Sequence, residues 1–505
     1  MLDLGTSFLA SVERDPGALA IVDGEMRLTY RQWYDKVSAL AAALSETGLT
    51  RGDHVLTAMQ NRWENATLHW ACQFLGLVIT PLNWRAKADE IDFGIEDAGA
   101  KAVFHDASTE EAVRLSRFAQ HLPQFSAEAL ADIMDGGAPD AVPVADAADW
   151  SLMLYTSGTT SKPKGVPRRH RAERAGGVAH VAQNLYRHGE RTLGVMPLYH
   201  TMGVRSLIAS SLIGGTFVCL QRFDAAKALD LIEKEKITNL YLVPTLYHDL
   251  VHHETFSAER VASVRKLGYA GASMTDGLLK RLDQTFRPEL FVNHYGSSEI
   301  YTFTIEQKAA AKPGSAGRAG INQTIRVVKL GSHDPDEPAA VGEEGEIIAL
   351  MKSDEAFEGY WNRPDADAKA LHGGWYFTGD TGFVDGDGDL FVTGRADDMI
   401  ITGGENVSPV EVESCLSLHD AVAEVAVVGL PDERWGKIVV AFIKRRGEVT
   451  AEDLDRHCRD SGLANFRRPR RFVFVDEIPK SPVGKLLRRL LVAGDYTEER
   501  IPEHQ

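Results

Sequence analysis

The stretch of this chain with the clearest chemical pattern runs from Tyr155 to Val166 and reads Tyr-Thr-Ser-Gly-Thr-Thr-Ser-Lys-Pro-Lys-Gly-Val. Glycine lets a backbone approach a ligand closely. The backbone N–H groups of such a loop can point at an anion, and lysines add positive charge. An apolar segment, Trp150 to Tyr155, leads into the loop and is expected to be a strand. The pattern indicates a loop that holds the phosphates of a nucleotide.

A Walker A loop is the first alternative, and it requires Gly-x-x-x-x-Gly-Lys-Ser/Thr. Counted from Gly158, the sixth position is Pro163, and Gly165 stands where Ser or Thr should bind Mg²⁺. The Walker A pattern is therefore absent. An ordinary Ser/Thr/Gly surface loop is the second alternative on composition. The lysines on both sides of Pro163 favour phosphate binding over it.

Composition and charge limit the class of protein. With 505 residues, 44% of them hydrophobic and 25% charged, the chain is typical of a globular protein with two to four domains. The net charge of −17 disfavours nucleic acid and anionic membranes as general partners. Four widely spaced cysteines, no signal peptide and no apolar run of roughly 20 residues predict a cytoplasmic protein with reduced thiols.

The segments that must position the loop alternate between helical and strand patterns. Such alternation favours α/β layers with largely parallel sheets. The predicted elements are helices 28–47, 66–77 and 225–236, the last with Asp224 as N-cap, and strands 54–59 and 239–243. Ala127 to Ala148, rich in Ala and Asp, is expected to be a loosely packed connection.

The pattern changes after about Gly345, where glycine–aspartate turns become dense and short β runs such as Leu390 to Thr393 lie between them. This predicts a small twisted sheet or β-barrel-like subdomain at the end of the large part. A compact α+β pattern follows, which predicts a separate small domain. Its predicted elements are helices 409–418 and 451–458 and strands 422–428, 438–445 and 471–475.

Five motifs in a fixed order resemble the superfamily of acyl-adenylate-forming enzymes, which includes acyl- and aryl-CoA ligases, peptide synthetase adenylation domains and luciferases. The resemblance covers nearly the whole chain. The motifs are 155–166, 295–299, 376–380, 394–398 and 482–485. Three positions depart from the family pattern: Ser161 replaces Gly, Ser298 replaces Thr, and Phe377 replaces Arg or Lys. Segments 196–200, 431–436 and 466–471 are most similar to benzoate-type ligases, including those for 4-chlorobenzoate.

The resemblance implies an AMP-forming carboxylic acid–CoA ligase with a large domain, 1–396, and a mobile small domain, 397–505, hinged near Asp397. A benzoate-type acid would attack the α-phosphorus of ATP, and the thiol of CoA would then displace AMP. Glu299 would bind Mg²⁺, Ser298 the α-phosphate, and Asp380 with Arg395 the ribose. The other implied nucleotide contacts are Thr156, Ser157, Gly158, Thr159, Thr160 and Lys164 around the phosphates, and Gly271, Ala272, Ser273, Tyr295 and Gly296 around the adenine.

The resemblance also assigns roles to the small domain. Lys485 would bridge the carboxylate and the α-phosphate in the first step. A domain rotation would then withdraw Lys485 and bring Gly403 and Gly404 to the site, where a slim pantetheine arm can pass. A tight turn without a ligand is the alternative for this glycine pair. The implied CoA contacts are Arg85, Trp435, Phe466, Arg467, Arg468, Arg470 and Arg471.

The acid pocket is the third implied site. By position its lining residues are His200, Tyr241, Ala270, His294, Gly296, Tyr301 and Thr302, with His200 beside the reacting groups as a gate or wall. The set contains no Arg or Lys, which favours a monocarboxylic aromatic acid over a dicarboxylate. His294, Tyr301 and Thr302 are able to bind a ring hydroxyl or amino group.

Four alternative functions stay open. An adenylation enzyme that loads a carrier protein shares the first half-reaction, although the arginines after Phe466 favour CoA. A CoA ligase for a medium-chain or alicyclic acid would use the same scheme. A luciferase-like oxygenase is more distant, and a regulator without turnover is disfavoured by the presence of Lys485, Glu299 and Asp380. A homodimer is a candidate assembly that the sequence does not determine.

Overall fold

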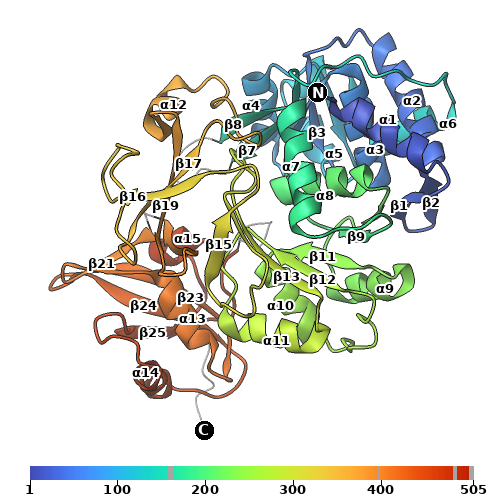
Figure 1. Ribbon diagram of the computed structural model, residues 1–505. Helices are drawn as coiled ribbons and strands as arrows, with labels where there is room; N and C mark the ends of the chain where they lie inside the picture. Colours follow the sequence, from blue (N-terminus) through green and yellow to red (C-terminus); the bar gives the residue numbers. More distant parts are fainter. Residues whose placement is uncertain (157–162, 396–397, 481–485, 500–505) are drawn as a thin grey trace.

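The computed structural model describes residues 1–156, 163–395, 398–480 and 486–499. A large α/β region is followed by a small α+β domain, as predicted, and the two lie against each other in Figure 1. The four cysteines carry free thiols. In the described part of the chain, no helix is both long and apolar enough to span a membrane.

The first sheet carries the predicted phosphate loop. Its six strands lie in the order β6-β5-β3-β4-β7-β8 and pair in parallel, except that β7 and β8 form an antiparallel hairpin. Thr156 pairs with Lys164 at the end of this hairpin where the chain passes from β7 to β8. The strands are β3 (His54–Ala58), β4 (Val78–Pro81), β5 (Ala102–His105), β6 (Gln124–Ser126), β7 (Trp150–Thr156) and β8 (Lys164–Arg169).

The helices of this region are α1 (Leu4–Arg14), α2 (Tyr30–Glu46), α3 (Trp63–Leu75), α4 (Ala88–Ala98), α5 (Glu110–Leu115) and α6 (Ala127–Asp135), with a 3₁₀ turn at Ala119–His121. Most of them bury one apolar face, whereas α3 is buried on nearly all sides. Residues 127–148 were predicted to be a loosely packed connection, and this prediction is wrong for Ala127–Asp135, which form α6. The Ser126 side chain caps α6, and Ala127, Leu130 and Met134 are buried at helical spacing in the main core.

The second sheet spans the middle of the molecule and joins two kinds of pairing. In the described part it has 14 strands; β9 to β13 pair in parallel, whereas β13 to β20 pair antiparallel and form the predicted small β subdomain. Its first strands are β1 (Leu19–Asp23), β2 (Met26–Thr29), β9 (Arg191–Gly194), β10 (Thr216–Cys219), β11 (Asn239–Leu242), β12 (Lys266–Tyr269) and β13 (Leu290–Tyr295). The antiparallel strands are β14 (Thr304–Glu306), β15 (Ser315–Ala319), β16 (Ile325–Lys329), β17 (Gly345–Leu350), β18 (Leu371–His372), β19 (Trp375–Val384) and β20 (Leu390–Arg395).

Six helices connect or cover this second sheet. They are α7 (His170–Gln183), α8 (Thr201–Leu212), α9 (Ala225–Glu235), α10 (Pro244–His252), α11 (Asp276–Phe286) and α12 (Pro364–Ala370). The predicted cap of α9 is confirmed, because the Asp224 side chain accepts a hydrogen bond of 2.9 Å from the Lys227 N–H. Parallel strands followed by helices bring their carboxyl ends to one edge, which is where ligands bind in such sheets.

The small domain confirms the predicted α+β pattern. Its strands lie in the order β22-β21-β24-β23, and β25 pairs with β24. The elements are β21 (Ile400–Thr402), β22 (Glu405–Val407), α13 (Pro409–Ser417), β23 (Val422–Asp432), β24 (Gly436–Arg445), α14 (Ala451–Asp460), β25 (Arg471–Phe474) and α15 (Arg488–Ala493). It contacts the large region where Arg446 Nη2 lies 3.1 Å from His252 Nε2 at the end of α10.

Candidate active site

Asp380 brings together side chains from three of the five motifs. It pairs with Arg395 across β19 and β20, and its Oδ1 accepts a hydrogen bond of 2.8 Å from Arg395 Nη1. Its Oδ2 accepts one of 2.6 Å from the Tyr295 hydroxyl at the end of β13. Burial raises the pKa of Tyr295, so the phenol keeps its proton and donates. The predicted ribose and adenine residues are therefore adjacent.

Glu299 forms a second group with the end of the phosphate hairpin. Its carboxylate is buried, and Oε1 accepts a hydrogen bond of 2.7 Å from the Tyr360 hydroxyl. Lys164 Nζ lies 3.9 Å from the centre of the Tyr360 ring. Burial lowers the pKa of Lys164, and the charge of Glu299 acts in the opposite direction. The sequence reasoning missed Tyr360, which belongs to none of the motifs.

The remaining nucleotide residues lie around these two groups. Ser298 Oγ is 3.3 Å from Thr201 Oγ1 at the start of α8. Gly271, Ala272 and Ser273 follow β12, which runs parallel to β13 and so ends beside Tyr295. A Cβ at Gly296 would lie 2.1 Å from the Tyr301 carbonyl oxygen, so only glycine fits. Ser157, Gly158, Thr159, Thr160, Asp397 and Lys485 lie outside the described residues.

The predicted acid-pocket residues Tyr241, His294, Tyr301 and Thr302 are all buried, and the ring centroids of Tyr241 and His294 are 5.1 Å apart. Ala270 follows β12 and is also buried. His200 lies at the rim, where its Nδ1 accepts from the Met202 N–H at 3.4 Å and caps α8. The set predicted from sequence is thus largely one cluster.

An arginine belongs to this cluster, which corrects the expectation that the pocket lacks Arg and Lys. Arg205 on α8 is 1% exposed. Its Nη1 donates to the Tyr301 carbonyl oxygen at 3.1 Å and to Thr302 Oγ1 at 2.8 Å, and its Nη2 donates to the Tyr241 hydroxyl. A single charged residue in the apolar run of α8 was the available sequence signal. Its partners are distant in sequence, so the contacts were not predictable.

The predicted CoA residues divide into two groups. Gly403 has φ of +61°, its N–H donates to the Trp435 carbonyl oxygen at 2.9 Å, and a Cβ there would lie 2.7 Å from the Trp435 ring. The Arg470 guanidinium stacks 4.3 Å from that ring. Arg468 instead pairs with Asp455 at 2.9 Å, and Phe466 packs against the core of the small domain.

Arg85 lies apart from the other predicted CoA residues. It is an exposed side chain of the large region and stacks 3.8 Å from the Trp84 ring. Gly404, like Gly403, has a positive φ, of +88°, which glycine adopts without strain. The structure therefore joins Gly403, Trp435 and Arg470 directly and leaves Arg85 on the opposite domain.

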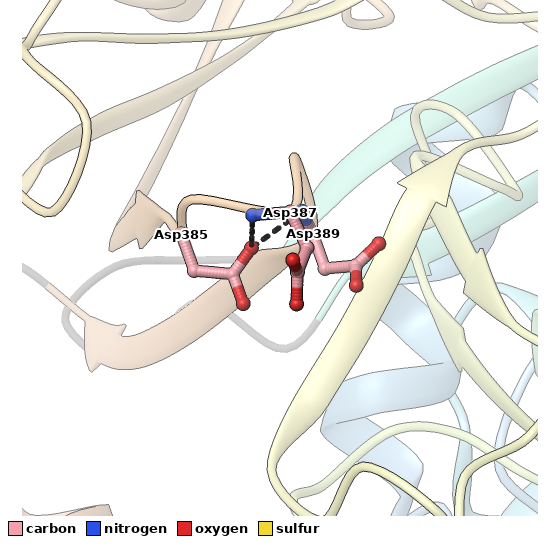
Figure 2. A group of neighbouring side chains, drawn as sticks. All are labelled: Asp385, Asp387 and Asp389. Carbon is pink, nitrogen blue, oxygen red and sulfur yellow. Dashed lines mark hydrogen bonds between the residues drawn. The ribbon is translucent and has the colours of Figure 1, made fainter.

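Three aspartates of the β19–β20 turn form an acidic group away from this site. Figure 2 shows Asp385, Asp387 and Asp389 with their carboxylates close together. Lys312 Nζ lies 2.6, 3.0 and 2.6 Å from the three carboxylates in turn, and Arg318 Nε lies 2.9 Å from Asp389, so two cations already offset part of their charge. Asp385 also accepts two backbone N–H groups at 3.0 Å. The group closes a turn.

Comparison with known proteins defines the class. A family model described as AMP-binding enzyme matches residues 8–361, and a model of the AMP-binding enzyme C-terminal domain matches residues 411–485. Together the two matches cover both predicted domains of the chain. The chain therefore belongs to the AMP-binding enzyme family, and the suspected acyl-adenylate-forming resemblance is confirmed.

The chain is also similar to individual members of this family. It is 36% identical over 489 residues to a 4-chlorobenzoate–CoA ligase from an Arthrobacter species, with 95% of this chain and 93% of the relative covered. ATP-bound MatB from Rhodopseudomonas palustris has a TM-score of 0.88 at 26% identity, covering 98% and 99% of the two chains. The anthranilate CoA ligase AuaEII with anthranoyl-AMP has a TM-score of 0.89 at 25% identity, covering 98% and 97%.

Proposed function

We propose that this chain is an ATP-dependent acid–CoA ligase that converts a benzoate-type aromatic acid into its CoA thioester. The observation that carries this proposal is the meeting of Tyr295, Asp380 and Arg395 beside Glu299 and Lys164, in a family member similar to aryl-CoA ligases. A carboxylate is a poor electrophile, so the acid must first be activated. Positioning and electrostatics carry most of the catalysis in such phosphorus chemistry.

In the first step a carboxylate oxygen of the acid bonds to the α-phosphorus of ATP, and the bond to the bridging oxygen breaks to release pyrophosphate. The Asp380 carboxylate would accept hydrogen bonds from the ribose hydroxyls while Arg395 holds it in place. Thr156, Lys164 and the loop between them would hold the leaving phosphates. Ser298 would donate to the α-phosphate.

The donor set at Glu299 fits a magnesium ion. Mg²⁺ is bound in nucleotide sites by one or two carboxylates together with substrate phosphates. Glu299 supplies one buried carboxylate, and the Tyr360 hydroxyl orients it by donating to Oε1. When bound, the ion would neutralise charge on the phosphates of ATP.

In the second step the thiol sulfur of CoA attacks the activated carbonyl, and AMP leaves as the C–O bond breaks. Gly403 would let the pantetheine arm pass beside Trp435, and Arg470 would bind a phosphate of CoA. A rotation of the small domain about Asp397 would exchange Lys485 for Gly403 at the site between the steps.

Reduced cysteines support a cytoplasmic location.

One assay tests the class of reaction. AMP release from ATP is measured over a panel of substituted benzoates and fatty acids, with and without CoA. We expect multiple-turnover AMP release that needs both an aromatic acid and CoA. Release that requires a carrier protein in place of CoA would favour the alternative adenylation enzyme. Formation of ADP would contradict the scheme, because it places bond breakage at the γ-phosphate.

Replacing Asp380 is expected to weaken nucleotide binding. Asp380→Asn keeps the side-chain shape but removes the charge that Arg395 and Tyr295 contact. Loss of charge-assisted hydrogen bonds costs about 1.5–3 kcal/mol each, so the KM for ATP should rise about 10- to 100-fold. Asp387→Asn, in the exposed turn of Figure 2, is the control and should leave the KM for ATP within about twofold. Equal effects of the two substitutions would contradict the assigned ribose contact.

A further inference from the structure

Arg205 carries an unpaired donor among the predicted acid-pocket residues. Its two terminal nitrogens bond to Tyr241, Tyr301 and Thr302, but its Nε has no hydrogen-bond partner among the described residues. Leaving a buried charged N–H without an acceptor is costly, and native structures rarely do so. The nearest charged acceptor, Glu355, makes no hydrogen bond to this nitrogen, and its own Oε2 is buried without a partner in the described part of the chain. The guanidinium therefore indicates a place where an oxygen acceptor can bind.

Two imidazoles beside Arg205 have unpaired nitrogens as well. His294 Nδ1 and His180 Nε2 are buried without partners in the described part of the chain. The two ring centroids are 5.2 Å apart and lie 5.1 and 4.7 Å from that of Tyr241, whose hydroxyl accepts from Arg205. The three unpaired nitrogens therefore belong to side chains that surround one tyrosine.

The hydrogen bonds of Asn184 define which nitrogens donate. Asn184 Nδ2 donates to the His180 carbonyl oxygen at 2.8 Å, which fixes the orientation of the amide. Asn184 Oδ1 must then accept, so the 3.1 Å contact from His294 Nε2 places the proton on Nε2. Burial lowers the pKa of His294 well below its usual value, so the ring is neutral and Nδ1 is an acceptor. Asn184 Nδ2 also donates to His180 Nδ1 at 3.1 Å, so the proton of that ring is on Nε2. The cluster thus offers two donors, Arg205 Nε and His180 Nε2, and an acceptor, His294 Nδ1.

Buried carboxylates already accompany the positive charges near Arg205. Arg168 pairs with Glu173 at 2.7 Å, with both side chains fully buried. Glu355 is buried too; burial raises its pKa and the positive charge of Arg205 acts against that rise. A second carboxylate on the substrate would add uncompensated negative charge to this buried group, whereas a hydroxyl would add none. The lone pair of an aromatic amino group is delocalised into the ring, so it accepts a hydrogen bond from Arg205 more weakly than a hydroxyl oxygen does.

The helix α8 sets the distance between this cluster and the reacting groups. Thr201 and Arg205 are four residues apart and lie on one face of the helix, about 6 Å along its axis. Thr201 Oγ1 contacts Ser298 Oγ at 3.3 Å, beside the candidate α-phosphate site. The backbone positions of Thr201 and Arg205 are therefore separated by about the length of one aromatic ring.

We infer that the pocket takes an aromatic acid with a neutral hydroxyl on the side of the ring remote from its carboxylate, with Arg205 Nε donating to the hydroxyl oxygen and His294 Nδ1 accepting its proton. This inference rests on the proposed function, because it names the substrate class of the same site. Arg205 and His294 determine specificity here and take no part in bond making.

The test compares four acids with the wild-type enzyme: benzoate, 4-hydroxybenzoate, 4-aminobenzoate and benzene-1,4-dicarboxylate. The kcat/KM of CoA-dependent AMP release should be at least about tenfold higher for 4-hydroxybenzoate than for any of the others, since a site that hydrogen-bonds a hydroxyl rejects analogues without it. Equal values across the panel, or preference for the amine or the dicarboxylate, would overturn the inference while leaving the ligase function intact. If no acid releases AMP, the proposed function fails and this inference fails with it.

Two variants test the residues themselves. Arg205→Met should reduce the ratio of kcat/KM for 4-hydroxybenzoate over benzoate by about tenfold or more, through the KM of the acid and not that of ATP. His294→Phe removes the acceptor Nδ1, together with the hydrogen bond from Nε2 to Asn184, and should reduce the same ratio. Arg114→Met, at an exposed pair with Glu111, is the matched control and should keep the wild-type ratio. An unchanged ratio in both pocket variants would overturn the assignment, and the wild-type panel remains decisive if Arg205→Met does not fold.

Discussion

Lys485→Ala is expected to slow formation of the acyl-adenylate by about 10²–10³-fold, because removing one preorganised donor from a developing charge has effects of this size. The proposed role of Lys485 is confined to the first step. Thioester formation from a supplied acyl-adenylate and CoA should therefore keep most of its wild-type rate. Pyrophosphate release measures the first step, and single-turnover release of AMP from the prepared adenylate measures the second.

Lys480→Ala is the matched control for this substitution. Lys480 precedes the same motif and pairs with Glu424 of the small domain at 2.5 Å. Its loss removes a lysine of the same domain without touching the proposed chemistry, so both half-reactions should stay within about twofold of wild type. If Lys485→Ala slowed both half-reactions equally, the exchange of Lys485 for Gly403 by domain rotation would be contradicted.

Glu173→Gln should produce the largest loss of stability. Glu173 accepts from Arg168 Nε at 2.7 Å and from the Tyr301 hydroxyl at 3.0 Å, and both members of the ion pair are fully buried. Removing one partner leaves a buried guanidinium uncompensated, at a cost of about 3–5 kcal/mol. For a domain of this size that lowers the Tm by about 5 °C, measured by thermal unfolding.

Two comparisons separate charge burial from other causes of that loss. Glu358→Gln breaks a partly exposed pair with Arg169 and should change the free energy of unfolding by less than about 1 kcal/mol. The double variant Arg168→Met/Glu173→Met removes both charges and should recover part of the stability lost in Glu173→Gln. A Glu173→Gln protein as stable as the Glu358→Gln protein would show that the buried pair contributes little.

Arg168 belongs both to the buried ion pair and to the contacts that hold the backbone of the candidate site. Its Nη1 donates to the carbonyl oxygens of Glu299 and Glu355 at 3.0 and 2.7 Å. The guanidinium therefore connects β8, which bounds the phosphate hairpin, to the backbone that presents the candidate Mg²⁺ ligand. Sequence reasoning did not find these contacts, because the two carbonyl groups lie more than 100 positions away in the chain.

Local patterns were predicted most reliably. The cap at Asp224 and the helix it starts, the strand before the phosphate loop and the elements of the small domain all depend on residues close in sequence. The exception is α6, which lies in the Ala- and Asp-rich segment predicted to be a loosely packed connection, although three of its apolar residues are buried. A helix of that length is stabilised by packing against its neighbours rather than by its own propensity.

The amino-acid sequence alone determined the α/β class, the small second domain and the motifs of an adenylate-forming enzyme. Each of these depends on patterns among residues that are close together in the chain. The tertiary structure decided which side chains complete the site. Tyr360 at Glu299 and Arg205 in the acid pocket lie outside every motif and reach their partners only after the sheets and α8 have packed. Hydrogen bonds and buried charges depend on distances in space, and those distances exist only in the folded chain.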